Sequence, residues 1–114
     1  MKSIRIGMAA VVLTLTLTAC GNSESGSGYH VNQDKEAFPE AIELYNTQRC
    51  LSCHATDLEG NMGSKSNLSQ IGSKLTKEEL IQVISEGRKM MPAYADQLSA
   101  EQIEMLAEWL STKS

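Results

Sequence analysis

The chain has 114 residues and a formal net charge of −4 at pH 7, which leaves room for one ordinary domain. Fourteen acidic residues outnumber ten basic ones, and no basic cluster offers a surface for phosphates, so we expect no nucleic-acid partner. Only five aromatic residues are available for a core, and a domain this small needs an additional stabilising group.

Residues 1–19 have the pattern of a secretory signal peptide. Lys2 and Arg5 supply the positive start, and residues 6–19 supply an apolar run that is too short and too rich in threonine to span a bilayer. We therefore leave these residues out of the fold. Without Lys2 and Arg5, eight basic residues face fourteen acidic ones, and the formal net charge becomes −6.

The signal ends in the letters LTAC followed by Gly21, which resembles the bacterial lipoprotein box. The resemblance implies that Cys20 carries a diacylglyceryl thioether and becomes the first residue of the mature protein. Two acyl chains are enough for stable membrane anchoring. We therefore expect Cys20 to attach the protein to lipid on the extracytoplasmic face of the cell membrane.

Residues 21–36 are rich in glycine, serine and polar side chains, which is typical of a flexible tether. The predicted organisation is a signal peptide at 1–19, the lipidated cysteine and tether at 20–36, and a folded domain at 37–114. His30 falls in the tether, where we expect it to be solvated.

Three stretches of the domain have helical patterns, at about residues 39–49, 77–86 and 100–112. Pro39 suits the first turn of the first helix, and Thr76 with Glu79 and Ser99 with Gln102 form capping boxes before the other two. Each stretch has apolar residues at helical spacing, and no run with the period of a β-strand is present. The fold class expected is all-α, with three main helices.

The letters CLSCH, at residues 50–54, fit three kinds of chemistry. Structural zinc needs four ligands, and adjacent Cys53 and His54 are poorly placed to share one tetrahedral centre. A redox dithiol favours a helix N-terminus in a βαβ setting, whereas this pair follows a helix. C-x-x-C-H is the attachment pattern of c-type haem, with Cys50 and Cys53 as thioether donors and His54 beside the iron. Export favours the haem reading.

Further along, Met91 directly precedes Pro92, in the letters EGRKMMPAY. With CLSCH and the three helices, this makes residues 38–113 resemble the small monohaem class I cytochromes c, specifically the lipid-anchored type of Gram-positive bacteria. The resemblance implies one covalent haem c, with His54 and Met91 as axial ligands and the first and last helices crossing beside it. Met90 is the rival ligand, and the position before proline favours Met91.

The same resemblance implies an electron carrier rather than an enzyme, between a quinol-cytochrome c reductase and a cytochrome c oxidase. We expect a monomer. Two alternatives stay open: a haem enzyme or gas sensor in which Met91 does not bind, and a cysteine-based thiol or metal lipoprotein without haem.

The surroundings of the haem are less well defined by the sequence. The residue that orients His54 stays open, with Ser66 and Asn67 nearest in sequence to the place expected for it. The candidates for the apolar shell of the haem are Leu51, Leu58, Leu68, Ile71, Ile84, Tyr94, Leu98 and Trp109.

Overall fold

The computed structural model describes residues 28–114, so the predicted signal peptide and Cys20 lie outside the described residues. Its helices are α1 (Pro39–Thr47), α2 (Cys50–His54), α3 (Lys77–Glu86) and α4 (Ala100–Ser111), with 3-10 turns η1 (Val31–Asp34), η2 (Ser64–Ser66) and η3 (Ile71–Ser73). Within residues 28–114 the backbone forms no strand and only one isolated bridge, so the all-α prediction is confirmed. None of these helices is long and apolar enough to cross a membrane.

The helix ends follow the capping signals in the sequence. Both predicted capping boxes form, with the side chains of Thr76 and Ser99 accepting from the backbone N–H groups of Glu79 and Gln102. Helix α3 has the predicted bounds, and α4 ends one residue early. Helix α1 stops at Thr47 instead of residue 49 because Arg49 adopts a left-handed conformation, with φ at 65°.

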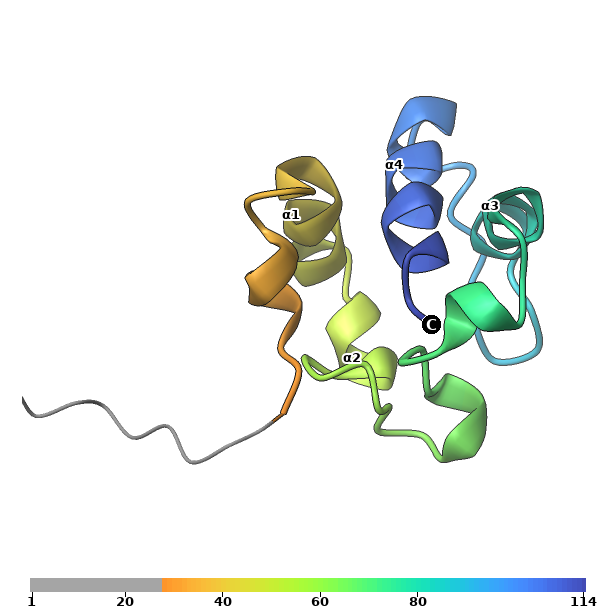
Figure 1. The fold of residues 1–114 in the computed structure, drawn as a ribbon. Helices are drawn as coiled ribbons and strands as arrows, with labels where there is room; N and C mark the ends of the chain where they lie inside the picture. The colour runs from red at the N-terminus through yellow and green to blue at the C-terminus, as the bar shows by residue number, and fades with distance from the viewer. Residues whose placement is uncertain (1–27) are drawn as a thin grey trace, which may run out of the picture.

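Helix α4 lies between α1 and α3 and packs against both (Figure 1). At the contact with α1, Tyr45 and Trp109 meet edge to face, with ring centroids 5.1 Å apart. Trp109 is fully buried. Its side chain belongs to this helix interface and does not line the cavity described below, so its predicted place in the haem shell was wrong.

The folded domain begins earlier than the predicted boundary at residue 37. Val31 is fully buried, and its N–H donates to the carbonyl of Thr56 at 2.8 Å. The Asp34 carboxylate accepts from the Tyr29 hydroxyl at 2.5 Å and from Trp109 Nε1 at 2.7 Å. Residues 29–34 are therefore part of the domain, although their polar composition resembles a tether.

Lys113 completes the cluster around Asp34. Its ammonium group forms a salt bridge with Asp34 and lies 4.7 Å from the centroid of the Tyr29 ring. Burial acts to raise the pKa of Asp34. Hydrogen bonds donated by Lys113, Tyr29 and Trp109 outweigh burial and hold that pKa below its ordinary value. The cluster joins the two ends of the described chain, which lie far apart in sequence.

Candidate functional site

The CLSCH segment forms a single helical turn, α2, between two residues in unusual backbone conformations. Arg49 precedes it at φ 65°, and Ala55 follows it at φ 63°. The hydroxyl of Tyr45, from α1, donates to the Ala55 carbonyl at 2.7 Å and holds the end of the turn. Cys50 and His54 are four residues apart and so lie on the same side of the turn, where both line one cavity.

The His54 ring is fixed by a backbone group. Its Nδ1 lies 2.6 Å from the carbonyl oxygen of Ser66. A carbonyl can only accept, so Nδ1 carries the proton and Nε2 is the nitrogen left for a ligand bond. Of the two residues that the sequence left open, Ser66 supplies the partner, through its main chain. The Ser66 hydroxyl in turn donates to the Gly63 carbonyl at 2.8 Å and fixes the turn that carries it.

Met91 is held through its backbone. Its N–H donates to the Arg88 carbonyl, and the Arg88 N–H donates to the Met91 carbonyl, both at 3.0 Å. Beyond the turn, the Tyr94 N–H donates to the Ile84 carbonyl at 3.0 Å, and the Tyr94 hydroxyl donates to the Gln48 carbonyl at 3.1 Å. The Met91 loop is thus tied both to α3 and to the chain just before CLSCH.

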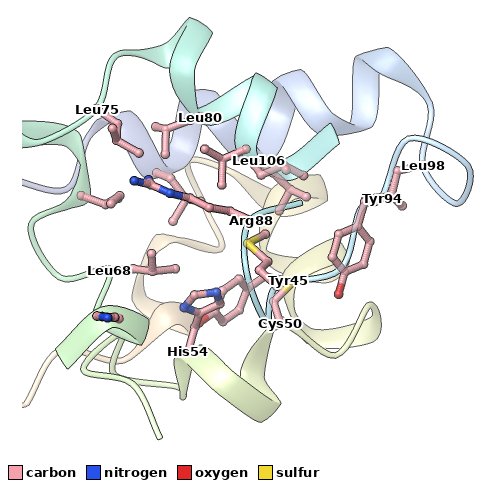
Figure 2. Close-up of a pocket in the computed structure, with 16 residues that line it drawn as sticks. Tyr45, Cys50, His54, Leu68, Leu75, Leu80, Arg88, Tyr94, Leu98 and Leu106 are labelled. Carbon is pink, nitrogen blue, oxygen red and sulfur yellow. The ribbon is translucent and has the colours of Figure 1, made fainter. Parts of the chain in front are cut away.

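Two adjoining cavities, of about 160 and 540 Å³, separate the CLSCH segment from the Met91 loop. Cys50, His54 and Met91 line both cavities, whereas Cys53 and the 83% exposed Met90 line only the outer one. Figure 2 shows Cys50, His54 and Tyr45 at one side and Leu75, Leu80 and Leu106 at the other. The structure therefore brings three of the four predicted haem-binding side chains to the inner cavity.

The walls of the inner cavity are apolar, as the sequence predicted, although their membership differs in part. Leu68, Ile71, Ile84, Tyr94 and Leu98 line it as expected. Leu51 and Leu58 do not line it; Leu58 is fully buried elsewhere in the core. The wall is completed by residues that were not predicted to lie beside the haem: Tyr45, Leu75, Leu80, Val83, Leu106 and Leu110.

The two thiols differ in environment. Cys50 is half-buried and Cys53 is exposed. Burial raises the pKa of the Cys50 thiol to about 11, whereas a catalytic dithiol depends on a lowered pKa. Among residues 28–114, no group of three or more His, Cys, Asp or Glu side chains is arranged to hold a metal ion. The surroundings of CLSCH thus favour neither a redox dithiol nor a zinc site.

Comparisons with known proteins point to one family. The family described as cytochrome c oxidase, cbb3-type, subunit III matches residues 36–110. Cytochrome c-551 of Bacillus subtilis (strain 168) is 33% identical, with 99% of each chain covered. The menaquinol:cytochrome c reductase cytochrome c subunit of the same organism is 30% identical over 96% of this chain and 46% of its own length.

A solved structure agrees with the fold. The KustC0563 c-type cytochrome superposes with a TM-score of 0.52 at 24% identity, covering 60% of this chain and 90% of its own. Taken with the match over residues 36–110 and the relative that spans the whole chain, this means that the chain belongs to the cytochrome c family. Its cofactor is haem c, covalently bound.

The residues that line the two cavities fit that cofactor. The apolar walls suit the porphyrin, and the free Nε2 of His54 suits the iron. Haem also carries two carboxylates, and Lys65 and Arg88 line both cavities and offer cations for them. Figure 2 shows the Arg88 side chain reaching between Leu68 and His54 on one side and Leu75 and Leu80 on the other. Arg88 is a site residue that was not predicted from the sequence; its position three residues before Met91 was the available signal.

Proposed function

We propose that this cytochrome is a membrane-tethered carrier of single electrons and not an enzyme. Cys50 and Cys53 would hold the haem through thioethers, and His54 and Met91 would bind its iron. The observation that carries the proposal is that His54 and Met91, which are 37 positions apart in sequence, line the same apolar cavity. A haem held by both of these residues would supply reversible one-electron chemistry.

The protein around the haem sets the conditions for that chemistry. Ser66 orients His54, and the paired backbone bonds between Arg88 and Met91 hold the methionine loop. Apolar walls exclude water, which disfavours the extra charge of the oxidised state and raises the reduction potential. Fixed positions for both ligands keep structural change small when the electron arrives or leaves.

The place of the carrier is inferred from the sequence and from its relatives. Residues 1–19 and Cys20 support export and lipid anchoring on the extracytoplasmic face of the cell membrane. One relative is named a subunit of a menaquinol:cytochrome c reductase, and the matching family is named for a cytochrome c oxidase subunit. We therefore propose that a quinol-oxidising complex donates the electron and a terminal oxidase accepts it.

Mass spectrometry and cell fractionation test this proposal together. Protein exported from a host that has haem-attachment machinery should yield a proteolytic peptide spanning residues 50–54 with one haem attached. The wild type should sediment with membranes, whereas Cys20→Ala should keep its haem and become soluble. A haem-free peptide would contradict the site, and unchanged sedimentation of Cys20→Ala would contradict the anchor.

A further inference from the structure

Three large apolar side chains are exposed within residues 28–114, and all three are methionines: Met62 at 52%, Met90 at 83% and Met105 at 41% exposure. The leucine, isoleucine, valine and aromatic side chains of the same range are buried or half-buried. A single exposed apolar residue is ordinary and needs no explanation. Met62 and Met90 are not isolated, however, because both line the outer cavity although they are 28 positions apart in sequence.

The two methionines lie on opposite sides of the opening, and each belongs to the segment that supports one proposed iron ligand. The Met62 N–H donates to the Ser66 hydroxyl oxygen at 3.0 Å, and the Ser66 carbonyl orients His54. Met90 directly precedes Met91, in a turn that two backbone hydrogen bonds close. The backbone therefore holds both exposed thioethers at the entrance to the cofactor site.

An exposed thioether reacts with hydrogen peroxide by oxygen-atom transfer. The sulfur lone pair attacks one peroxide oxygen, so that an S–O bond forms and the O–O bond breaks. The second oxygen takes up the proton of the first and leaves as water. The sulfur loses two electrons, which the peroxide gains. Methionine sulfoxide reductases return the polar sulfoxide to methionine with electrons from a dithiol, which becomes a disulfide.

Met91 carries the same group in different surroundings. It is half-buried and lines both cavities. As the proposed iron ligand it would use its sulfur lone pair in the bond to the metal, so peroxide should attack it last. Met105 provides the opposite comparison, because it is exposed on α4 but lines neither cavity.

We propose that Met62 and Met90, called the methionine pair, form a reversible oxidation site that tunes the cofactor. Hydrogen peroxide converts the pair from apolar thioethers to polar sulfoxides and thereby lowers the reduction potential. The physical reason is that sulfoxide dipoles and the water they bind, placed at the opening, favour the extra charge of the oxidised iron. The inference rests on the proposed electron-carrier function.

The test uses the haem-loaded, full-length protein, treated with hydrogen peroxide and then freed of it. Mass spectrometry of proteolytic peptides reports the sulfoxide at each methionine, and potentiometry reports the reduction potential before and after treatment. Met62→Leu with Met90→Leu removes both sulfurs of the pair and keeps the side chains apolar. Met105→Leu is the matched control, because it removes an exposed thioether away from both cavities.

Before treatment, all variants should have the wild-type potential. After treatment, the wild type should carry sulfoxide at Met62 and Met90, with Met91 oxidised at least about tenfold more slowly. The potential should fall in the wild type and in Met105→Leu, but not in the double variant. Methionine sulfoxide reductases with dithiothreitol should then restore it.

Three results would overturn the inference while the carrier function stands. An equal fall in the double variant would place the reactive group elsewhere. Sulfoxide at the methionine pair with an unchanged potential would reduce the reaction to surface damage, and no sulfoxide at the pair would show that it is no oxidation site. Oxidation of Met91 as fast as Met105 would instead contradict the proposed bond from Met91 to the iron, and with it the proposed function.

Discussion

The two sides of the cavity hold their proposed iron ligands by different means. The His54 side chain is fixed directly, by the 2.6 Å hydrogen bond that its Nδ1 donates to the Ser66 carbonyl. Met91 is positioned through its main chain, by the two bonds it shares with Arg88. The chemistry of the side chains explains the difference. Imidazole has a second nitrogen that can be fixed without occupying the first, whereas a thioether has only its sulfur.

On each side a glycine packs closely against the backbone: Gly60 against Ser66, and Gly87 against Met91. At Gly60, with φ at 89°, a Cβ atom would lie 2.7 Å from the backbone carbon of Ser66. At Gly87, with φ at 75°, a Cβ atom would lie 2.7 Å from the Met91 carbonyl oxygen. Both positions need glycine for conformation and for close packing. Each ligand therefore depends on a closely packed glycine, and substitution of one glycine disturbs one side of the cavity at a time.

Removal of the methionine sulfur should have the largest effect. In Met91→Ala the reduction potential should fall by on the order of a few tenths of a volt, within the range of about 0.8 V over which axial ligands act. The reduced iron should then bind carbon monoxide. Met90→Ala is the matched control and should change neither property, because the Met90 side chain is largely exposed. Similar behaviour of the two variants would show that Met91 is not the ligand.

Alanine at the two glycines should separate the two sides. Gly60→Ala and Gly87→Ala should each lower the free energy of unfolding by about 2–4 kcal/mol, from left-handed strain and overpacking. Gly87→Ala should displace Met91, lower the potential and admit carbon monoxide. Gly60→Ala should weaken the bond from His54 to Ser66, make the imidazole less basic and raise the potential, with the iron still closed.

Gly63→Ala is the control for both. Gly63 has φ at 82°, but a Cβ atom there would meet nothing within 4 Å. Because alanine keeps the backbone carbonyl that accepts from the Ser66 hydroxyl, we expect a loss of only about 1–2 kcal/mol, from conformation alone, and an unchanged potential. Denaturant titration and potentiometry measure both quantities. Potential shifts of the same sign in Gly60→Ala and Gly87→Ala would contradict the distinction between the two sides.

A variant away from both ligands separates stability from redox properties. Asp34→Asn removes the carboxylate that binds Tyr29, Trp109 and Lys113, and it should cost about 2–3 kcal/mol at neutral pH without altering the potential. The lowered pKa of Asp34 contributes stability at pH values above its ordinary value of 3.8. That contribution is lost as the pH falls through the lower, folded-state value.

Equilibrium unfolding between neutral pH and pH 3 tests this prediction. The wild type should lose its advantage over Asp34→Asn below about pH 4. A constant difference across that range would show that the charge of Asp34 contributes nothing.

The smallest effect is expected at the hydrogen bond that joins the Met91 loop to the chain just before CLSCH. Tyr94→Phe removes the 3.1 Å bond from the Tyr94 hydroxyl to the Gln48 carbonyl and should cost about 0.5–1.5 kcal/mol. Because the aromatic ring still lines the cavity, the potential should change little. Thermal unfolding followed in the visible band of the haem measures this cost. A shift in potential as large as that of Gly87→Ala would mean that Tyr94 positions Met91 directly.

The sequence predicted the helical framework well because its signals are local. Capping boxes at Thr76 and Ser99 depend on neighbours three residues away, and α3 and α4 begin where they indicate. The CLSCH motif likewise carries its chemistry within five residues. Where local signals mislead, a distant contact is the cause: Asp34 lies in a polar stretch, yet it pairs with Trp109, which is 75 positions away.

Two features of the site had no signal that sequence reasoning could use. The partner of His54 is a main-chain carbonyl, which any residue at position 66 would provide, so its side chain identifies nothing. Trp109 is apolar and on the expected helix stripe, but the stripe does not tell whether the ring faces the cavity or α1. In the structure, Leu106 and Leu110 face the cavity while Trp109 packs on Tyr45.

We propose above all that His54 and Met91 both bind the iron of one covalent haem. A visible spectrum of the reduced full-length protein, recorded before and after addition of carbon monoxide, tests it most directly. Sharp α and β bands that carbon monoxide does not shift are the predicted result. Bands that shift on addition of carbon monoxide would show an open position at the iron and would contradict the account.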